Sequence, residues 1–414
     1  MPTSRFMDGC SAVSADLGPF RLGVNYWPAS SAMAWLADYD PAVTRDDFGR
    51  IADAGFDTVR VFVRWEDAQP SARVVERSVI DRLVDAADAA GETGVALIVT
   101  LFTGHMSGVN WVPPWALGGV DGDKRFRMMS GGRVRPPGSG MRNWYSDDEV
   151  VTAQESLAAV VAGALSGHPA VWAWDLGNEN SNCTVPPDRS SAEAWMERMA
   201  GAVQDADPGR LVTVGIHMED LEEDRGIGPA EVARWCDFVS MHGYPIYADW
   251  ATGPTDDRLV PFLAHITRWL AGGAPVLFEE FGLPTLPPAG TAGATSSMLV
   301  DEDVAASYTG SVIDTLWAEG SMGALLWCFS DYAPELFDEA PFDLAVHERS
   351  FGLWRADGTA KPAVAMVLAR SGRGRLAPGA LPWLDIGPEE FITDRKAQLA
   401  RLYRRYCEVS APAP

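Results

Sequence analysis

Two stretches of the chain, WDLGNEN at residues 174–180 and PVLFEEFG at residues 275–282, decide how the rest of the sequence is interpreted. Each closes an apolar run with a glutamate, Glu179 in the first and Glu280 in the second. Such runs are typical of parallel strands that other elements cover on both faces. Two strands of this kind can bring their carboxyl groups together at one end of a sheet.

Outward from these stretches, short apolar runs alternate with longer helical patterns, as in parallel βα units. We expect strands at residues 22–26, 58–63, 95–102, 171–176, 211–216, 238–241, 276–280 and 324–329. We expect helices at residues 46–54, 78–90, 231–235, 257–270, 303–317 and 362–370. Two further helices are expected to begin at capping boxes, Ser146 with Glu149 and Ser190 with Glu193.

Eight strand–helix pairs predict an α/β fold, a (β/α)8 TIM barrel with elaborated loops. The alternative is an open doubly wound sheet, which normally carries a glycine-rich phosphate turn after its first strand. Residues 24–28 read VNYWP, so no such turn is present there.

We assign residues 1–372 to one barrel domain and residues 373–414 to a C-terminal extension that is too short to be a separate domain. Within this extension, residues 389–406 predict one amphipathic helix docked on the barrel. Its apolar side comprises Phe391, Leu399, Leu402 and Tyr406. Two long connections, 103–145 and 283–297, follow strands on the face where such barrels hold their active sites.

The formal charge of −24, from 57 acidic and 33 basic residues, argues against nucleic acid or an anionic membrane surface as a partner. No apolar stretch approaches the roughly 18 residues that a membrane span needs, and the first residues lack the apolar segment of a signal peptide. Five scattered cysteines, at positions 10, 183, 236, 328 and 407, indicate reduced thiols and no zinc site. These features predict a cytoplasmic protein.

The two glutamates predict the chemistry. Cleavage of a glycosidic bond needs one carboxyl to protonate the leaving oxygen and a second to meet the positive charge on the anomeric carbon. Glu179 and Glu280 follow the fourth and seventh expected strands, whose ends face each other across the mouth of a barrel. Either glutamate alone is more often an ordinary ion-pair partner at the rim, so the surrounding residues decide between the two readings.

Those residues resemble the retaining glycoside hydrolases of the clan that contains the family 5 cellulases and mannanases. The resemblance covers roughly residues 20 to 370 and includes Asn178-Glu179 and Glu280-Phe281-Gly282. It implies that Glu179 is the acid/base and Glu280 the nucleophile. The supporting, substrate-binding residues that it implies, in sequence order, are Arg60, His105, Asn178, His242, Tyr244 and Trp327.

Roles for these residues follow from the resemblance and from chemistry. Asn178 is expected to bond the sugar 2-hydroxyl, and Tyr244 to donate to Glu280. Arg60 is expected to keep Glu280 ionised, while apolar surroundings raise the pKa of Glu179. The two histidines, His105 and His242, are expected to bond sugar hydroxyls. Trp327 is expected to form the floor under the sugar.

Two local ambiguities remain at the level of sequence. Adjacent residues alternate in direction along a strand, so Glu279 is expected to face the helix layer or a neighbouring loop, with an arginine or hydrogen-bond partner. His217, Glu219 and Asp220 could form a metal cluster, but a solvated rim is the expectation. The chemistry of the resembled family needs no metal and no cofactor.

The sequence therefore predicts a retaining β-glycosidase that acts on carbohydrate, without specifying manno or gluco configuration or an oligomeric state. The alternatives are an endo-β-glycanase of the same family, a metal-dependent barrel hydrolase and a catalytically silent sugar-binding barrel. Residues 103–145 carry Trp111, Trp115 and Trp144. Long connections of this kind often form lids or binding loops, which favours exo-type release of single sugars.

Overall fold

A closed barrel of eight parallel strands forms the centre of the computed structural model, which describes residues 17–119, 125–287 and 297–409. The barrel strands are β1 (Arg21–Asn25), β2 (Thr58–Arg64), β3 (Ala96–Thr103), β8 (Val171–Asn178), β9 (Leu211–His217), β10 (Val239–His242), β11 (Val276–Phe281) and β12 (Gly323–Leu326). They follow one another around the barrel in sequence order, and β12 closes it against β1. The predicted (β/α)8 barrel is confirmed.

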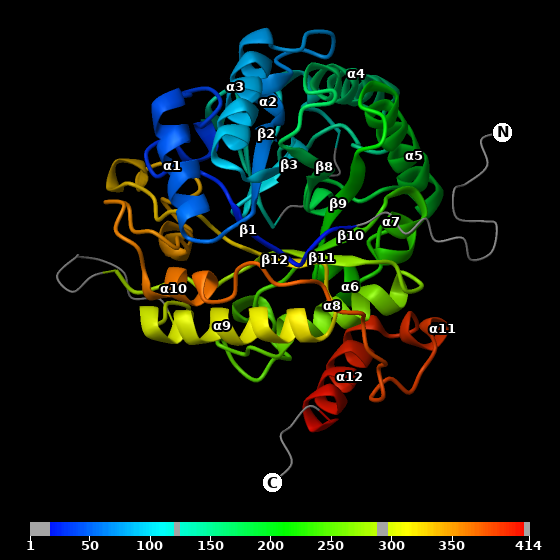
Figure 1. Cartoon of the computed structure of the whole chain (residues 1–414). Coiled ribbons are helices and arrows are strands. Elements are labelled where there is room, and N and C mark those ends of the chain that lie inside the picture. The colour runs from blue at the N-terminus through cyan, green and yellow to red at the C-terminus, as the bar shows by residue number, and fades with distance from the viewer. Residues whose placement is uncertain (1–16, 120–124, 288–296, 410–414) are drawn as a thin grey trace.

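Helices surround the barrel in Figure 1, so that each strand is buried between the barrel interior and a helix layer. The helices of this layer are α1 (Pro41–Asp53), α3 (Arg77–Thr93), α4 (Asp148–Ala164), α5 (Arg189–Ala206), α7 (Pro229–Trp235), α8 (Leu259–Leu270), α9 (Glu302–Ala318) and α10 (Pro362–Leu368). Two single-turn helices, α2 (Trp65–Ala68) and α6 (Glu219–Glu222), follow strands at the barrel mouth. All eight predicted strands lie within three residues of their expected ends, the largest difference being that β12 ends at Leu326.

The helix starts differ from the predicted capping boxes. Asp147, not Ser146, caps α4 and accepts hydrogen bonds from the backbone N–H groups of Glu149 and Val150. Asp188 likewise caps α5 and accepts from Ser191. A carboxylate also complements the positive end of the helix dipole, which a serine hydroxyl does not, so aspartate takes the cap where both residues are near.

The connection after β3, for which no strands were predicted, is not a simple loop. It contains a four-stranded sheet of β4 (His105–Met106), β5 (Val109–Trp111), β6 (Arg127–Ser130) and β7 (Arg133–Val134). These strands have two to four residues each, too short for sequence periodicity to reveal them. The sheet gives this connection a fixed shape beside the barrel mouth. Residues 120–124, and most of the second long connection (288–296), lie outside the described residues.

The C-terminal helix predicted over residues 389–406 is two helices, α11 (Pro388–Phe391) and α12 (Arg395–Val409). The hydroxyl of Thr393 donates to the carbonyl of Glu390 at 2.7 Å. This local side-chain bond competes with the backbone hydrogen bonds that would join the two helices into one. The predicted apolar side is buried, and α12 docks beside α8, where Tyr403 meets Phe262 with ring centroids 5.1 Å apart.

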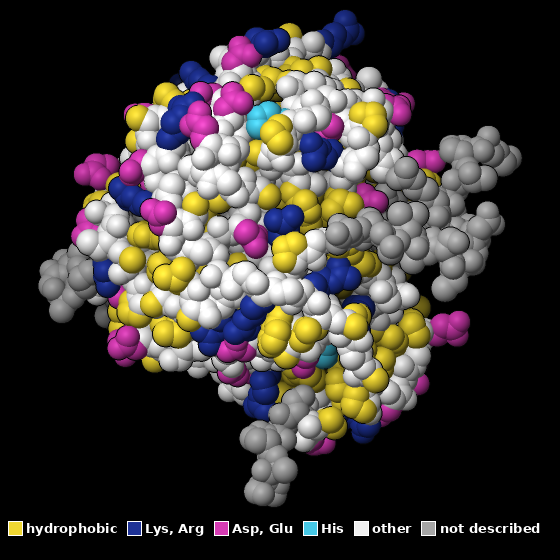
Figure 2. Space-filling view, in the orientation of Figure 1, with side chains coloured by type: hydrophobic (Ala, Val, Ile, Leu, Met, Phe, Trp, Pro, Cys, Tyr) yellow, Lys and Arg dark blue, Asp and Glu magenta, His cyan; other side chains and the backbone are white. Residues whose placement is uncertain are grey.

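Charged side chains of both signs lie on the surface (Figure 2). Figure 2 shows Lys and Arg side chains interspersed with Asp and Glu side chains, so the negative net charge is not gathered on the face in view. Within the described ranges, no helix combines the length and apolarity needed to cross a bilayer. Cys236, Cys328 and Cys407 carry free thiols, whereas Cys10 lies outside the described residues.

Candidate active site

A cavity of about 340 Å³ lies at the carboxyl ends of the barrel strands. This volume is at the lower end of the range for small-molecule sites, about 300–1,000 Å³. Seven of the eight predicted site residues line it: His105, Asn178, Glu179, His242, Tyr244, Glu280 and Trp327. The eighth, Arg60, has no exposed surface and lies beneath the cavity, so its predicted contact with substrate is corrected to a supporting position.

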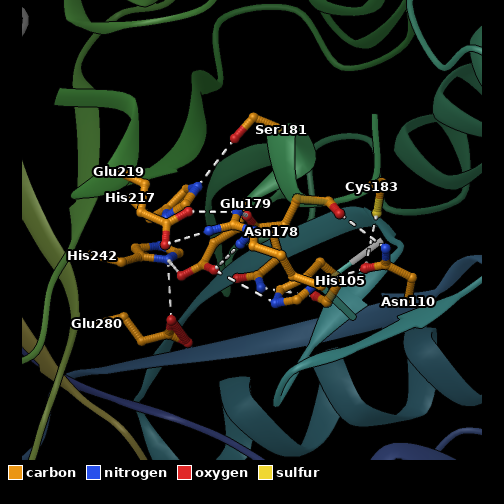
Figure 3. Close-up of polar contacts among 12 residues, drawn as sticks. His105, Asn110, Asn178, Glu179, Ser181, Cys183, His217, Glu219, His242 and Glu280 are labelled. Atoms are coloured by element: carbon orange, nitrogen blue, oxygen red, sulfur yellow. Dashed lines mark hydrogen bonds and ion pairs between the residues drawn. The ribbon is translucent and has the colours of Figure 1, made fainter. Parts of the chain in front are cut away.

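The two predicted catalytic carboxyl groups meet at one histidine. His242 Nδ1 lies 3.0 Å from Glu179 Oε1 and 3.0 Å from Glu280 Oε2. The ligand atoms of these three side chains all lie within 4.8 Å of one another. Figure 3 shows His242 between the two glutamates; Glu179 directly follows β8, and Glu280 lies on β11.

Local backbone geometry aims Glu179 into the cavity. Glu179 has a left-handed φ of 49°, and its N–H donates to the carbonyl of Gly215 on β9 at 2.9 Å. Gly177 precedes it with φ 147°, and a Cβ there would lie 2.3 Å from the Asn180 side chain. Only glycine fits that position, so the order Gly-Asn-Glu-Asn turns the chain at the end of β8.

The pKa of Glu179 is lowered, which contradicts the expectation that apolar surroundings raise it. Burial favours the neutral acid, but the charge of His217 and the hydrogen bond and charge of His242 outweigh it, with a smaller contribution from His105. His105 and His242 were expected to contact sugar and His217 to lie at a solvated rim, so their combined field on the carboxylate was not predicted. The lowered pKa favours the ionised form of Glu179.

His242 holds the corresponding proton. Burial disfavours the charged imidazolium, but the charge of Glu280 and the hydrogen bonds to Glu179, Glu279 and Glu280 raise the pKa of His242 well above its usual value. Because His242 has no exposed surface, the positive charge is screened very little by water.

Glu279 faces the barrel interior, so its predicted direction toward the helix layer or a neighbouring loop is wrong, whereas the predicted arginine partner is present. Its Oε1 lies 3.6 Å from Arg60 Nε and its Oε2 lies 3.4 Å from His242 Nε2. The register against β10 jumps from Phe278 to Glu280, which marks a bulge in β11 at this point. A bulge interrupts the alternation of side chains, so both adjacent glutamates turn inward.

Arg60 organises the layer below the cavity. Its Nη2 donates to Asp175 Oδ2 at 2.7 Å and to Asn178 Oδ1 at 3.0 Å. Glu280 Oε1 lies farther away, 3.7 Å from Nη1, so the pairing with Asp175 is the closer one. The sequence analysis missed Asp175, although it stands inside WDLGNEN; an aspartate in an apolar strand was the available signal.

Hydrogen bonds fix the orientation of two cavity residues. Asn178 Nδ2 donates to the His105 carbonyl at 2.9 Å, which leaves its second hydrogen for a ligand. His105 Nδ1 contacts Asn110 Oδ1 at 2.7 Å, and Asn110 Nδ2 donates to the carbonyl of Asn182 at 2.9 Å. The Asn110 oxygen therefore accepts from His105, whose Nε2 turns toward Glu179, 3.9 Å away.

Asn182 is a cavity residue that the sequence analysis missed. Its Nδ2 donates to Glu179 Oε2 at 2.9 Å, while its Oδ1 accepts from Arg225 Nη1 at 3.3 Å. Arginine has only donors, so the amide can be oriented in one way and its N–H must face Glu179. Its place three residues after the predicted acid, in the 3-10 turn η3 (Asn180–Asn182), was the available signal.

The cluster after β9 is not the solvated rim that the sequence analysis expected. His217 and Asp220 are buried, and Ser181 Oγ donates to Asp220 at 2.7 Å and contacts His217 Nε2 at 3.1 Å. Glu219 is paired with Arg125 Nη2 at 2.7 Å. The carboxylates of Asp220 and Glu219 are thus already paired with other side chains of the protein. His217 lines the cavity beside Glu179.

Tyr244 and Trp327 form part of the remaining wall. Both line the cavity and are nearly buried. Burial and the charge of Glu280 raise the pKa of Tyr244 well above its usual value, so the phenol keeps its proton and can donate. The expected contacts, Tyr244 to Glu280 and Trp327 to a sugar, stay predictions.

In the part of the chain that the structure describes, the group able to hold a metal ion is Glu179, His242 and Glu280. These are the same three side chains that a metal-free double displacement would use. The raised pKa of His242 favours a proton on Nδ1, the atom that lies between the two carboxylates. A metal ion bound there would have to replace that proton.

Comparison with known families agrees with this geometry. Residues 22–332 match the model of the family described as cellulase (glycosyl hydrolase family 5). The chain belongs to glycosyl hydrolase family 5. Among family 5 relatives, the putative mannan endo-1,4-beta-mannosidase 5 of Oryza sativa subsp. japonica is 27% identical over 296 residues, 64% of this chain and 56% of the relative. The chain thus spans little more than half the length of that relative.

Two solved structures have the same fold over most of the chain. A GH5_18 variant from Streptomyces cattleya, in complex with Manb1-4GlcNAc, has 24% identity and a TM-score of 0.75, covering 93% of this chain and 90% of that chain. The exo-beta-1,4-mannosidase Op5Man5 from Opitutaceae bacterium strain TAV5 has 25% identity and a TM-score of 0.68, covering 84% of this chain and 58% of that one.

Proposed function

We propose that this chain is a retaining β-glycosidase that releases single sugars from the non-reducing end of small β-linked oligosaccharides, with β-mannosides as the first substrates to test. The separation of the two carboxyl groups carries the proposal. Their nearest ligand oxygens lie within 4.8 Å of each other. Retaining enzymes hold these groups about 5–5.5 Å apart, whereas inverting enzymes need about 6.5–9.5 Å for a water molecule between them.

In the first step Glu280 attacks the anomeric carbon while the bond from that carbon to the leaving oxygen breaks. Glu179 gives its proton to the leaving oxygen, and a glycosyl ester on Glu280 results. In the second step Glu179 takes a proton from water, which attacks the anomeric carbon and frees Glu280. Two inversions give net retention.

His242 supplies a route for the first proton. The proton is favoured on His242, because the charge of Glu280 is the largest of the effects that raise the pKa of His242 against burial. As Glu280 forms the ester it loses that charge, and the pKa of His242 falls. The proton can then pass over the 3.0 Å contact from Nδ1 to Glu179 Oε1, and from Glu179 to the leaving oxygen.

A clamp between two loops supports exo action. Arg127 on β6 binds Asp343, in the connection after β12, through two hydrogen bonds of 2.8 and 2.6 Å. Phe126 and Ala345, next to the clamp, line the active-site cavity. Met129 and Phe342, on the other side, line a second cavity of about 730 Å³. The clamp thus lies between residues that line the two cavities, and we expect it to keep the active-site cavity short.

The relatives support a β-mannoside substrate but divide on the mode of attack. The rice relative is named an endo-acting mannosidase, and Op5Man5 an exo-acting one. The alternative is therefore an endo-β-glycanase in which the clamp opens. A cytoplasmic location is part of the proposal, and the free thiols of Cys236, Cys328 and Cys407 support it.

The test is hydrolysis of nitrophenyl glycosides and of a defined series of β-1,4-linked manno-oligosaccharides. We expect release of single sugars from the non-reducing end and a first-formed anomer of retained configuration in proton NMR. Mid-chain products would favour the endo alternative, and an inverted anomer would exclude double displacement. A chelator should leave the rate unchanged; a loss reversed by a divalent cation would favour the metal-dependent alternative.

Glu280→Gln tests the nucleophile in the same assays. The amide has the same size but cannot attack the anomeric carbon, so turnover should vanish while the melting temperature stays near that of the unmodified protein. A mechanism-based fluoro-sugar should label Glu280 in peptide mapping. A label on the neighbouring Glu279 would overturn the assignment.

A further inference from the structure

A third glutamate lines the active-site cavity without a part in the mechanism above. Glu348 lies in the 3-10 helix η6 (Val346–Ser350), in the connection after β12, and is 7% exposed. It shares the cavity wall with Ser107, Trp327 and His347. Neither the resemblance nor the sequence pattern identified it.

The protein leaves the carboxyl group of Glu348 short of donors. The Tyr247 hydroxyl donates to Glu348 Oε1 over a long 3.3 Å and lies closer to His347 Nε2, at 2.7 Å. His347 Nε2 is itself 3.5 Å from Glu348 Oε1. Among the described residues, neither Glu348 Oε2 nor the hydroxyl of the neighbouring Ser107 has a hydrogen bond of good geometry, although Ser107 and Trp327 lie close enough to Glu348 to act against the rise of its pKa. One oxygen of this buried carboxyl group, Oε2, is therefore left without a well-formed hydrogen bond.

A buried carboxyl group with an unused oxygen is unfavourable unless a ligand supplies the missing donor. Burial raises the pKa of Glu348 to about 7, and the charge of Glu280 acts in the same direction. Near neutral pH the group can thus accept a hydrogen bond as a carboxylate or donate one as an acid. A sugar hydroxyl can do both, and it is the group that this cavity is proposed to admit.

We propose that Glu348 is a specificity-determining residue that binds a hydroxyl of the sugar to be released, at a ring position beyond the 2-hydroxyl. This inference rests on the proposed function of the cavity. Ser107 and Tyr247 complete the polar wall around that hydroxyl. The connection that carries Glu348 also carries Asp343 of the clamp, so hydroxyl recognition and closure of the cavity depend on the same segment.

The test combines variants with deoxy substrates. Glu348→Ala, Glu348→Gln and the unmodified protein are assayed on the best nitrophenyl glycoside and on its 2-, 3-, 4- and 6-deoxy analogues. We expect Glu348→Ala to lower kcat/KM about 10- to 100-fold on the full sugar, the effect of losing one charged hydrogen bond. Glu348→Gln, which keeps an acceptor, should lose less. The exposed Glu335 of the same connection offers a matched control, and Glu335→Ala should leave kcat/KM unchanged.

The decisive measurement is whether the effect of Glu348→Ala and the effect of removing a sugar hydroxyl are additive. One of the 3-, 4- or 6-deoxy analogues should be a poor substrate of the unmodified protein but lose nothing further in Glu348→Ala, because both changes remove the same bond. Equal losses on every analogue, or coupling to the 2-hydroxyl alone, would overturn the proposal while leaving the glycosidase assignment intact. If the unmodified protein hydrolyses no glycoside, the proposed function itself fails. Thermal unfolding of each variant separates loss of binding from loss of fold.

Discussion

Arg60→Met should destabilise the protein strongly, because it removes the cation that serves a buried set of carboxylates. Arg60, Asp175 and Glu279 have no exposed surface, and two hydrogen bonds of 2.7 and 3.2 Å join the arginine to Asp175. Removing one partner of a buried ion pair costs about 3–5 kcal/mol. Since domains are stable by roughly 5–15 kcal/mol, we expect a loss of this size in the free energy of unfolding at neutral pH.

The loss should shrink as the pH falls. Burial and the charge of Glu279 raise the pKa of Asp175 to about 6, and Arg60 holds it down. Without Arg60 the folded-state pKa rises further above the unfolded value of about 3.9. Between these values the folded variant binds more protons than the unfolded chain, so its stability decreases with rising pH. The penalty is complete above the folded-state pKa and is lost toward the unfolded value.

Urea unfolding at pH 7.5 and pH 5, with the unmodified protein beside the variant, measures both effects. The double variant Arg60→Met with Asp175→Asn is the matched control, because a neutral amide no longer requires a cation. It should be more stable than Arg60→Met at pH 7.5. A loss below about 1 kcal/mol, a loss that does not change with pH, or a double variant with additive losses would refute this reasoning.

Three further predictions concern catalysis and the clamp. Asn182→Ala removes a donor to the ionised form of Glu179, so the pKa of Glu179 should rise. The corresponding limb of the pH profile of kcat/KM should then move to higher pH. An unmoved limb would show that Asn182 only fills space. Glu179→Ala should lose on the order of 10²–10⁴-fold on substrates with poor leaving groups, less on activated aryl glycosides, with partial rescue by azide; equal losses without rescue would contradict its role as acid. Arg127→Ala should free Asp343 and lengthen the cleft, so that mid-chain products appear from longer oligosaccharides. Rates on nitrophenyl glycosides should stay within about threefold, since a partly exposed ion pair contributes about 1 kcal/mol or less. Unchanged products would mean that the clamp does not limit the cleft.

The barrel could be predicted from the sequence because its signals are local and repeated. Each strand is an apolar run of a few residues, and buried parallel strands need such runs regardless of their partners. The glutamates at residues 179 and 280 could be found for the same reason, since each directly follows or ends such a run. The short strands β4 to β7 could not be found, because runs of two to four residues have no periodicity to detect.

Other features depended on atoms that are distant in sequence. The direction of Glu279 follows from a bulge in β11, and a bulge shows only in the register against β10. The lowered pKa of Glu179 follows from histidines on three other segments, and electrostatic effects depend on distances in space. The sequence by itself determined the strand order and which carboxylates stand at strand ends, since periodicity and turn residues are written along the chain. Only the tertiary structure decided their protonation, their partners and the enclosure of the cavity, because those depend on which segments lie within a few ångströms of one another.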